Sequence, residues 1–448
     1  MKKNYPNYNN KCNNNFEDID TEYKNYKLSY KNKYQRNKEQ NLQFIRFDRI
    51  RIQINFKNLM LLFYLIIIFL PISFSKKFIS NLRKMNLYEE ITIFIEAKGE
   101  QQILSNDFNF EPSIVLINGI DKTENYKNKT IYLESPNSKI TLRWNAKLNT
   151  CNGMFQQLNN IISIDLSNFD SSNVISTASM FNECSNLKYI NFKNFVTSSV
   201  SEMQFMFSNC NSIISLDLNN FNTKKVTNMG AMFKECISLV SLDLSGFDTS
   251  LVTDVSYMFC YCFSLKSLDI HSFNTISTTN IYVMFVNCNS LKSLDLSNFN
   301  TKSIVSMASL FENCYSLISL NLKNFNTKLV TDMSKMFYNC TSLISLDLSS
   351  FDISSLTNTE NMFDKCNSLI FINLISFEEK KTISNLLFKK ISNDLIYCIN
   401  EINAPTFNNA FKIYGLKNNC SNVCFLETKR PARCRARSGG CRRLRNAS

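Results

Sequence analysis

Histidine is almost missing from this sequence, since His271 is the single one among 448 residues. Most general acid–base catalysis and many zinc sites rely on histidine. The sequence also contains no nucleophile–histidine pair, no phosphate-binding loop and no metal-ligand motif. Asp269 is the one acidic residue close to His271 in the sequence. We therefore expect a protein that is not an enzyme and that holds no cofactor or metal.

The centre of the chain has no surplus of positive charge, although the whole chain carries a net charge of +13. Residues 151–377 contain 12 Lys against 17 Asp/Glu, which gives −5. Residues 1–58 contain 13 Lys/Arg against 6 Asp/Glu, which gives +7, and residues 429–448 contain eight basic residues and no acid. Nucleic acids require a basic binding face, so we expect no nucleic-acid partner. The tail 429–448 uses Arg where the rest uses Lys, which indicates a basic tail or a sequence artefact.

Residues 1–58 form a low-complexity basic segment rich in Asn, Lys and Tyr, with a composition typical of disorder. An uncharged, mostly apolar run follows at 59–75. This run suits a signal anchor whose N-terminus is inside, or the core of a signal peptide whose translation starts at Met60. Both interpretations stay open. Either one places the chain from Lys76 onward on the cell surface, as a single-pass membrane protein, or in the secreted fraction.

Residues 76–150 are expected to form a small β-rich cap. Four apolar, often β-branched runs occur there, namely ITIFIEA, SIVLING, TIYLES and KITLRWN. We expect Trp144 to pack in this unit. The first coil of a solenoid exposes an apolar end that needs such a cap.

A repeat of constant length occupies 151–377. The pair Met-Phe begins at Met154 and returns with a 26-residue step, with one replacement at Leu310. A phenylalanine from Phe169 to Phe377 recurs with the same step over nine copies, without insertion or deletion. This period lies in the range of leucine-rich repeats. The sequence therefore predicts a solenoid of nine 26-residue coils.

One copy, residues 239–265, shows the expected coil. The alternation in LVSLDLS predicts a strand with Leu242 and Leu244 inward and Asp243 outward. Apolar residues from Val252 to Cys262 follow at spacings of three and four, which predicts a short helical turn. We thus expect an α/β fold, in which a parallel β-sheet lines the concave side of a leucine-rich-repeat solenoid.

The pattern C-x-S-L-x-S-L-D-L-S-x-F-D/N-T-x-x-V-T-x-M-x-x-M-F resembles the BspA-like leucine-rich repeats, in the variety catalogued in mycoplasma surface lipoproteins. It is best kept in 210–233, 236–259, 314–337 and 340–363, and the resemblance covers about half of the chain. Proteins similar to this are surface or secreted proteins of bacteria and single-celled eukaryotes, and several take part in adhesion. The resemblance implies a surface binding scaffold and leaves the ligand open.

A cysteine ladder accompanies the repeat. We expect these thiols to pack as small buried hydrophobes, in preference to a metal site or disulfides between coils. Leu158 stands at the equivalent position of the first copy, which fits a purely apolar requirement. The ladder consists of Cys184, Cys210, Cys236, Cys262, Cys288, Cys314, Cys340 and Cys366.

Outward-facing Ser and Asp residues form the candidate concave binding face. Three interpretations stay open for its aspartates: a solvated acidic face, a surface for a basic partner or a glycan, and a calcium site between neighbouring carboxylates. Asn191, Asn321 and Asn373 replace Asp in three copies and would relieve charge repulsion. The face consists of Ser163, Asp165, Ser215, Asp217, Ser241, Asp243, Ser245, Ser267, Asp269, Ser293, Asp295, Ser345 and Asp347.

Cys398, Cys420 and Cys424 lie in 378–428, which we interpret as a C-terminal cap with incidental thiols or as the start of a disulfide-stapled module. N-glycosylation sequons begin at Asn128, Asn339, Asn419 and Asn446 and support export only weakly.

The sequence as a whole predicts a non-enzymatic surface or secreted scaffold that recognises a protein or glycan, probing its ligand with many shallow contacts. Residues 59–75 would hold it to the membrane if they are not cleaved. An intracellular leucine-rich-repeat regulatory scaffold is the alternative, and an enzyme hidden in the β unit or the tail is a distant third.

Overall fold

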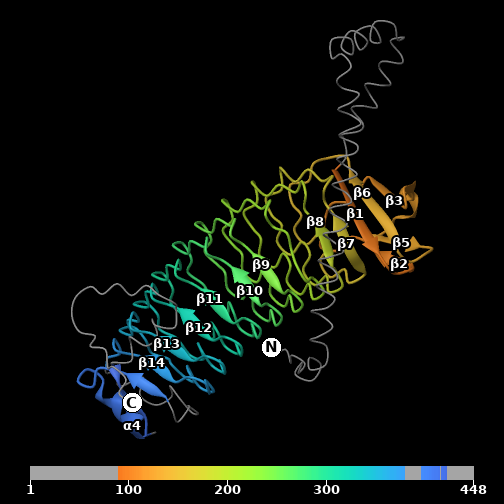
Figure 1. Cartoon of the computed structure of the whole chain (residues 1–448). Helices are drawn as coiled ribbons and strands as arrows, with labels where there is room; N and C mark the ends of the chain where they lie inside the picture. Colours follow the sequence, from red (N-terminus) through yellow and green to blue (C-terminus); the bar gives the residue numbers. More distant parts are fainter. Residues whose placement is uncertain (1–88, 379–394, 414, 421–448) are drawn as a thin grey trace, which may run out of the picture. The chain divides into compact units, whose positions relative to one another are not determined.

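The computed structural model describes residues 89–378, 395–413 and 415–420. Within these residues the repeats form a β-solenoid of about eight parallel-stacked coils, with almost no helix (Figure 1). The predicted segments 1–58, 59–75 and 429–448 lie outside the described residues. Among the residues that are described, no helix is both long and apolar enough to cross a membrane.

The N-terminal unit is built from the predicted β-rich runs and one short 3-10 helix. All four runs form strands, and Trp144 is buried among them, with 3% of its surface exposed. The elements are β1 (Glu89–Ile95), β2 (Gly99–Gln102), β3 (Ile114–Ile117), β4 (Ile120–Asp121), η2 (Thr123–Asn125), β5 (Thr130–Leu133) and β6 (Ser138–Trp144).

This unit continues directly into the first coil. Its main sheet has the order β4-β3-β6-β1-β7-β8, in which β7 (Ile161–Asp165) and β8 (Tyr189–Asn191) belong to the solenoid. Strand β1 pairs antiparallel with β7, whereas β7 pairs parallel with β8. Strand β1 thus covers the edge that the first coil would otherwise expose, which is the role of a solenoid cap.

Short parallel strands mark the later coils on one side of the stack, which we call the strand face (Figure 1). In β9 and β10, Leu242 lies opposite Leu268 and Asp243 opposite Asp269, so equivalent residues are in register. The segment around Asp217 carries no assigned strand. The strands are β9 (Ser241–Asp243), β10 (Ser267–Asp269), β11 (Ser293–Asp295), β12 (Ser319–Asn321), β13 (Ser345–Asp347) and β14 (Phe371–Asn373).

The predicted short helical turn is not formed in the described coils, so the fold differs slightly from the predicted α/β class. Residues 255–262 form consecutive hydrogen-bonded turns, in which the N–H of Met258 donates to the carbonyl of Val255 and that of Cys262 to the carbonyl of Phe259. A helix with its side chains is about 10 Å wide, whereas neighbouring strands lie about 4.8 Å apart. Helices in every coil would therefore not fit a stack held at strand spacing on both sides.

Backbone hydrogen bonds between coils provide that spacing on the side of the turns. The N–H group of Phe259 donates to the carbonyl of Met284 in the next coil at 3.0 Å, and the equivalent N–H groups of other coils repeat this bond. Parallel bridges, such as the one between Asn228 and Asp254, continue this second ladder. Hydrogen bonds hold neighbouring coils at the same spacing on both sides, which does not favour strong curvature of the strand face. The concave shape of this face stays a prediction.

Two residues of each turn segment have left-handed backbone conformations. Ala231 and Glu235 have φ values of 54° and 60°, and Tyr257 and Tyr261 repeat this with 57° and 64°. This conformation costs a residue with a side chain about 1–2 kcal/mol, and glycine avoids that cost. The coil-to-coil hydrogen bonds of these residues offset it. Sequence periodicity does not distinguish such turns from a helix, because the apolar spacing is the same.

Lys335 offers a direct test of the left-handed turn, because it is exposed and has a φ of 54°. We expect Lys335→Gly to leave the free energy of unfolding unchanged or to raise it by up to about 1 kcal/mol. The matched variant Lys328→Gly, at an exposed position without a positive φ, should lose about 0.5–1 kcal/mol. Denaturant unfolding measures both, and an equal loss in the two variants would contradict the turn geometry.

The core is a set of side-chain ladders that run through the coils. Rings of the Met-Phe pairs stack, for example Phe181 on Phe207 and Phe207 on Phe233, each with centroids 5.6 Å apart. A second ladder stacks the phenylalanines that end the strand motif, such as Phe221 on Phe247 at 6.4 Å. Each coil alone leaves both ring faces open, so stacking is what buries them.

The C-terminal end is closed by β15 (Ile396–Cys398), α4 (Pro405–Ile413) and β16 (Lys417–Asn418), and β14, β15 and β16 pair in parallel. The Tyr397 ring stacks on Phe411 at 4.4 Å, and its hydroxyl hydrogen-bonds the Asn408 side chain at 2.7 Å. A disulfide joins Cys398 to Cys420. Both interpretations for 378–428 stay predictions, and Cys424 lies outside the described residues.

Candidate binding face

The outward aspartates of the strand face build the turn that follows each strand. The Oδ1 atom of Asp243 accepts the N–H of Ser245 at 2.9 Å, and Asp295 and Asp347 accept in the same way from Ser297 and Ser349 at 2.9 and 3.0 Å. These are Asx turns, which Asn forms equally well. Asp at this position therefore has a structural role that the predicted acidic surface did not include.

Every residue of the candidate binding face reaches the surface. Two groups differ in exposure. The exposed members are Ser215, Asp217, Asp243, Ser267, Asp269, Ser293, Asp295 and Asp347. The half-buried members are Ser163, Asp165, Ser241, Ser245 and Ser345.

Asparagine relieves the repulsion between carboxylates at two places on the strand face. The Asn191 Nδ2 group donates to the Asp165 Oδ1 atom at 2.9 Å, and Asn373 does the same to Asp347 at 2.9 Å. Asp217, Asp243, Asp269 and Asp295 instead follow one another without an intervening Asn. The strand face is thus most acidic in its middle, since like charges at strand spacing are not separated there.

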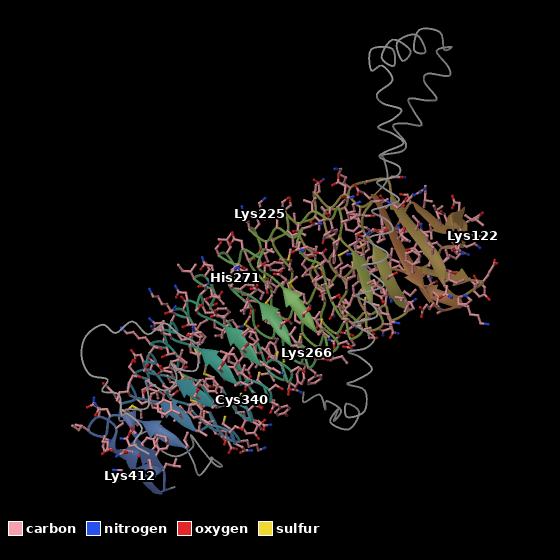
Figure 2. The ribbon with its side chains drawn as sticks, in the orientation of Figure 1. Lys122, Lys225, Lys266, His271, Cys340 and Lys412 are labelled. Carbon is pink, nitrogen blue, oxygen red and sulfur yellow. A yellow bond between two sulfur atoms is a disulfide. The ribbon has the colours of Figure 1, made fainter. Side chains whose placement is uncertain are left out.

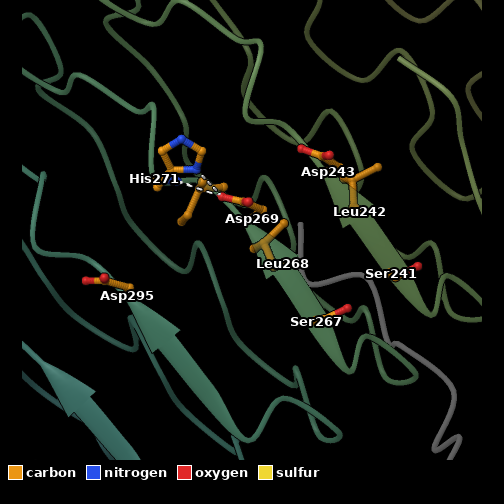
Figure 3. A pocket seen from close by; sticks show the side chains of 9 residues that line it. Ser241, Leu242, Asp243, Ser267, Leu268, Asp269, His271 and Asp295 are labelled. Atoms are coloured by element: carbon orange, nitrogen blue, oxygen red, sulfur yellow. Dashed lines mark hydrogen bonds and ion pairs between the residues drawn. The ribbon is translucent and has the colours of Figure 1, made fainter. Parts of the chain in front are cut away.

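A shallow pocket of about 370 Å³ lies in this middle part (Figure 3). Its lining includes Asp243, Asp269, Asp295 and His271, together with Leu242 and Leu268. Hydrogen bonds from the side chain and backbone of Ser245 lower the pKa of Asp243. Those from His271 lower the pKa of Asp269. Both carboxylates therefore stay ionised further into the acidic range than a free aspartate.

Among the described residues, the His271 side chain hydrogen-bonds an aspartate and no nucleophile. Its Nδ1 atom lies 2.6 Å from the Asp269 Oδ1 atom. The pocket serines, Ser241 and Ser267, lie at the opposite ends of their strands from the imidazole (Figure 3). A serine nucleophile must reach a hydrogen bond with its histidine, so this arrangement does not form a Ser-His-Asp triad.

The cysteine ladder is buried inside the coils, as predicted for packing residues. Its member Cys340 is labelled in Figure 2. All eight thiols are fully buried, and each donates to a phenylalanine carbonyl of the preceding coil. Cys236 donates to Phe207 and Cys262 to Phe233, both at 3.1 Å. Burial raises the pKa of Cys236 to about 12, so the thiol keeps its proton for this bond. Within the described residues, no group of three or more His, Cys, Asp or Glu is placed to hold a metal ion.

A threonine ladder was not predicted, although its signal is visible in the sequence. The hydroxyl of Thr223 donates to the carbonyl of Asp248 at 2.9 Å and accepts the N–H of the same residue at 2.8 Å. In five other coils, the threonine two residues after the phenylalanine that ends the strand motif donates to the next coil in the same way. Its members are Thr197, Thr223, Thr249, Thr275, Thr301 and Thr327, all buried. A polar residue that recurs with the period of the core is the signal that indicates such a ladder.

Comparison with known proteins finds one family for the repeats. Residues 149–267, 207–317 and 261–371 each match a family described as "Mycoplasma protein of unknown function, DUF285". The matched residues lie within the stacked coils. This result agrees with the predicted resemblance to mycoplasma repeat proteins. No curated protein matches the chain. The fold is that of a repeat solenoid, and its coils are similar to this mycoplasma repeat family.

Proposed function

We propose that the chain is a non-enzymatic scaffold of the cell surface or the secreted fraction, in which nine BspA-like leucine-rich-repeat coils present the strand face to a protein or glycan. Residues 59–75 would anchor it in the membrane or be removed as a signal peptide. The observation that carries the proposal is the middle of the strand face, where exposed carboxylates recur at strand spacing around a shallow pocket.

The C-terminal disulfide supports the location. Disulfides persist in oxidising surroundings and are rare in the cytosol. The bond joins Cys398, the last residue of β15, to Cys420, two residues after the end of β16. It therefore cross-links the C-terminal end of the stack. An intracellular regulatory scaffold would not keep this bond, which makes it the less supported alternative.

Charge supports the kind of ligand. Asp243, Asp269 and Asp295 would attract a protein segment rich in Lys or Arg, and their oxygens would also accept hydrogen bonds from sugar hydroxyls. A calcium ion between carboxylates needs six to eight oxygen ligands. The Asx turns occupy one oxygen of each aspartate, which favours the basic protein partner over calcium.

Binding by the strand face can be tested with Asp-to-Asn variants, because Asn already occupies the equivalent position in three coils. Asn replaces Asp naturally at Asn191, Asn321 and Asn373, so the triple variant D243N, D269N, D295N should fold normally. We expect it to bind arrays of Arg-rich peptides at least 10-fold more weakly than the parent chain, with a reduced salt dependence. Surface plasmon resonance at two salt concentrations measures both.

The matched control removes three exposed acids from the turn side, in the triple variant E183Q, E202Q, E360Q. It changes the net charge by the same amount and should retain binding within about twofold. Equal weakening in both triple variants would show that only net charge matters. If the parent binds neutral glycans and no peptide, and the Asn variants keep that binding, the acidic middle is not the binding site.

A further inference from the structure

Of the glycosylation sequons, the one at Asn128 lies in a tight turn of the N-terminal unit. Asn128 and Lys129 have φ values of 49° and 64°, and the backbones of Lys127 and Thr130 close the turn with hydrogen bonds of 3.1 and 2.8 Å. Two left-handed residues in succession define a type I′ turn, in which Asn is preferred at the first position. Asn128 is exposed at the tip of this turn.

The Asn128 side-chain amide makes no hydrogen bond to any residue that the structure describes. The adjacent Lys129 and Thr130 are tied to the body of the unit. The Lys129 ammonium donates to the carbonyl of Asn106 at 3.0 Å, and the Thr130 hydroxyl donates to Glu100 at 2.9 Å. A substituent on the Asn128 Nδ2 atom would therefore extend into solvent without breaking a contact.

The sequon at Asn339 has the opposite surroundings. Its Nδ2 atom donates to the Asn313 Oδ1 atom of the preceding coil at 2.8 Å. The next residue, Cys340, is fully buried, and Thr341 donates to the carbonyl of Tyr315 at 3.2 Å. A sugar on Asn339 would break the amide bond between coils and would have to fit between neighbours at strand spacing.

We infer that Asn128 carries an N-linked oligosaccharide and that Asn339 does not. This inference rests on the export in the proposed function. The donor would be an oligosaccharide on a lipid pyrophosphate, supplied by a transferase of the producing cell. A bond forms between the Asn128 Nδ2 atom and the anomeric carbon, while the bond from that carbon to the phosphate oxygen breaks. The lipid pyrophosphate leaves with the electron pair, and a base of the transferase accepts the proton that Nδ2 loses.

The position of the glycan fits a scaffold that displays its coils. Asn128 belongs to the N-terminal unit and precedes β7, so the modification lies outside the residues of the strand face. A hydrophilic chain at this place would also hinder association of neighbouring molecules through the exposed Ile120 and Tyr132 of the same unit, which are 63% and 66% exposed.

The test uses the full chain, produced with its own N-terminal segment in a eukaryotic cell line and compared by mobility and peptide mapping before and after a peptide-N-glycosidase. We expect a glycosidase-sensitive shift and deamidation at position 128. Asn128→Gln and Thr130→Val should abolish this modification, whereas Thr130→Ser should keep it, because serine retains the sequon hydroxyl. Asn339→Gln should leave the shift unchanged.

The oxidation state of Cys398 and Cys420 separates failure of this inference from failure of the proposed export. A chain with an oxidised pair and no glycan at position 128 would overturn this inference and leave the proposed export intact. A chain with two reactive thiols and no glycan would overturn both. A modification found at position 339 would overturn the contrast between the two sequons.

Discussion

Phe207→Ala is expected to lower the free energy of unfolding by about 3–5 kcal/mol. Phe207 is fully buried and stacks on Phe181 and Phe233, each at 5.6 Å. Alanine would remove both ring contacts and leave a cavity that crosses two coil interfaces. The stacked backbones cannot close the cavity, because hydrogen bonds fix the spacing of the coils. Denaturant unfolding followed by circular dichroism measures the loss.

Phe205→Ala is the matched control, two positions away in the chain. Phe205 points outward, with 44% of its surface exposed, and has a φ of 57°. Its truncation should cost within about 0.5 kcal/mol, as surface substitutions usually do. Similar losses at the two positions, or a loss below about 1 kcal/mol for Phe207→Ala, would contradict the stacked ring ladder.

Removal of the C-terminal disulfide is expected to have the next largest effect. Cys398 and Cys420 are separated by 22 residues, and a loop of this size corresponds to about 3 kcal/mol of stabilisation in the chain-entropy description. The double variant C398S, C420S should therefore destabilise the C-terminal end by this amount. Limited proteolysis near the exposed Asn403 should become faster in the variant, since the last strands would open more often.

Reductant provides the control for this prediction. It should destabilise the parent chain to the level of the double variant and leave the variant unchanged. Cys424→Ser should behave like the parent, because it leaves the bond between Cys398 and Cys420 in place. A parent chain that does not respond to reductant would show that the two cysteines are not joined.

The sequence predicted the part of the fold that depends on side-chain period. Alternation placed Leu242 and Leu244 inside and Asp243 outside, and the 26-residue recurrence of cysteine indicated buried thiols. It did not predict that the described coils contain no helix. The spacing from Val252 to Cys262 suits a helix and consecutive turns equally, and the spacing of the stack decides between them. That spacing is a property of neighbouring coils, which a single copy does not show.

The geometry of the candidate face followed from the sequence only in part. The outward position of the aspartates follows from strand alternation, but their role in closing the next turn depends on the distance from Asp243 to the Ser245 N–H. The threonine ladder was missed because a threonine in a repeat is usually assigned to the solvent-exposed surface. The hydroxyl of Thr223 bridges to Asp248 of the next coil, a contact that only stacking creates.

The central claim, that the solenoid is displayed outside the cytoplasm, is tested most directly on intact cells that carry an epitope tag after Asn403. The account predicts that antibody and protease reach the tag without permeabilisation, or that the tagged chain is in the medium. It also predicts that Cys398 and Cys420 react with a membrane-impermeant thiol reagent only after reduction. A tag protected in intact cells, together with two cysteines that react without reduction after lysis in the presence of an alkylating agent, would contradict it.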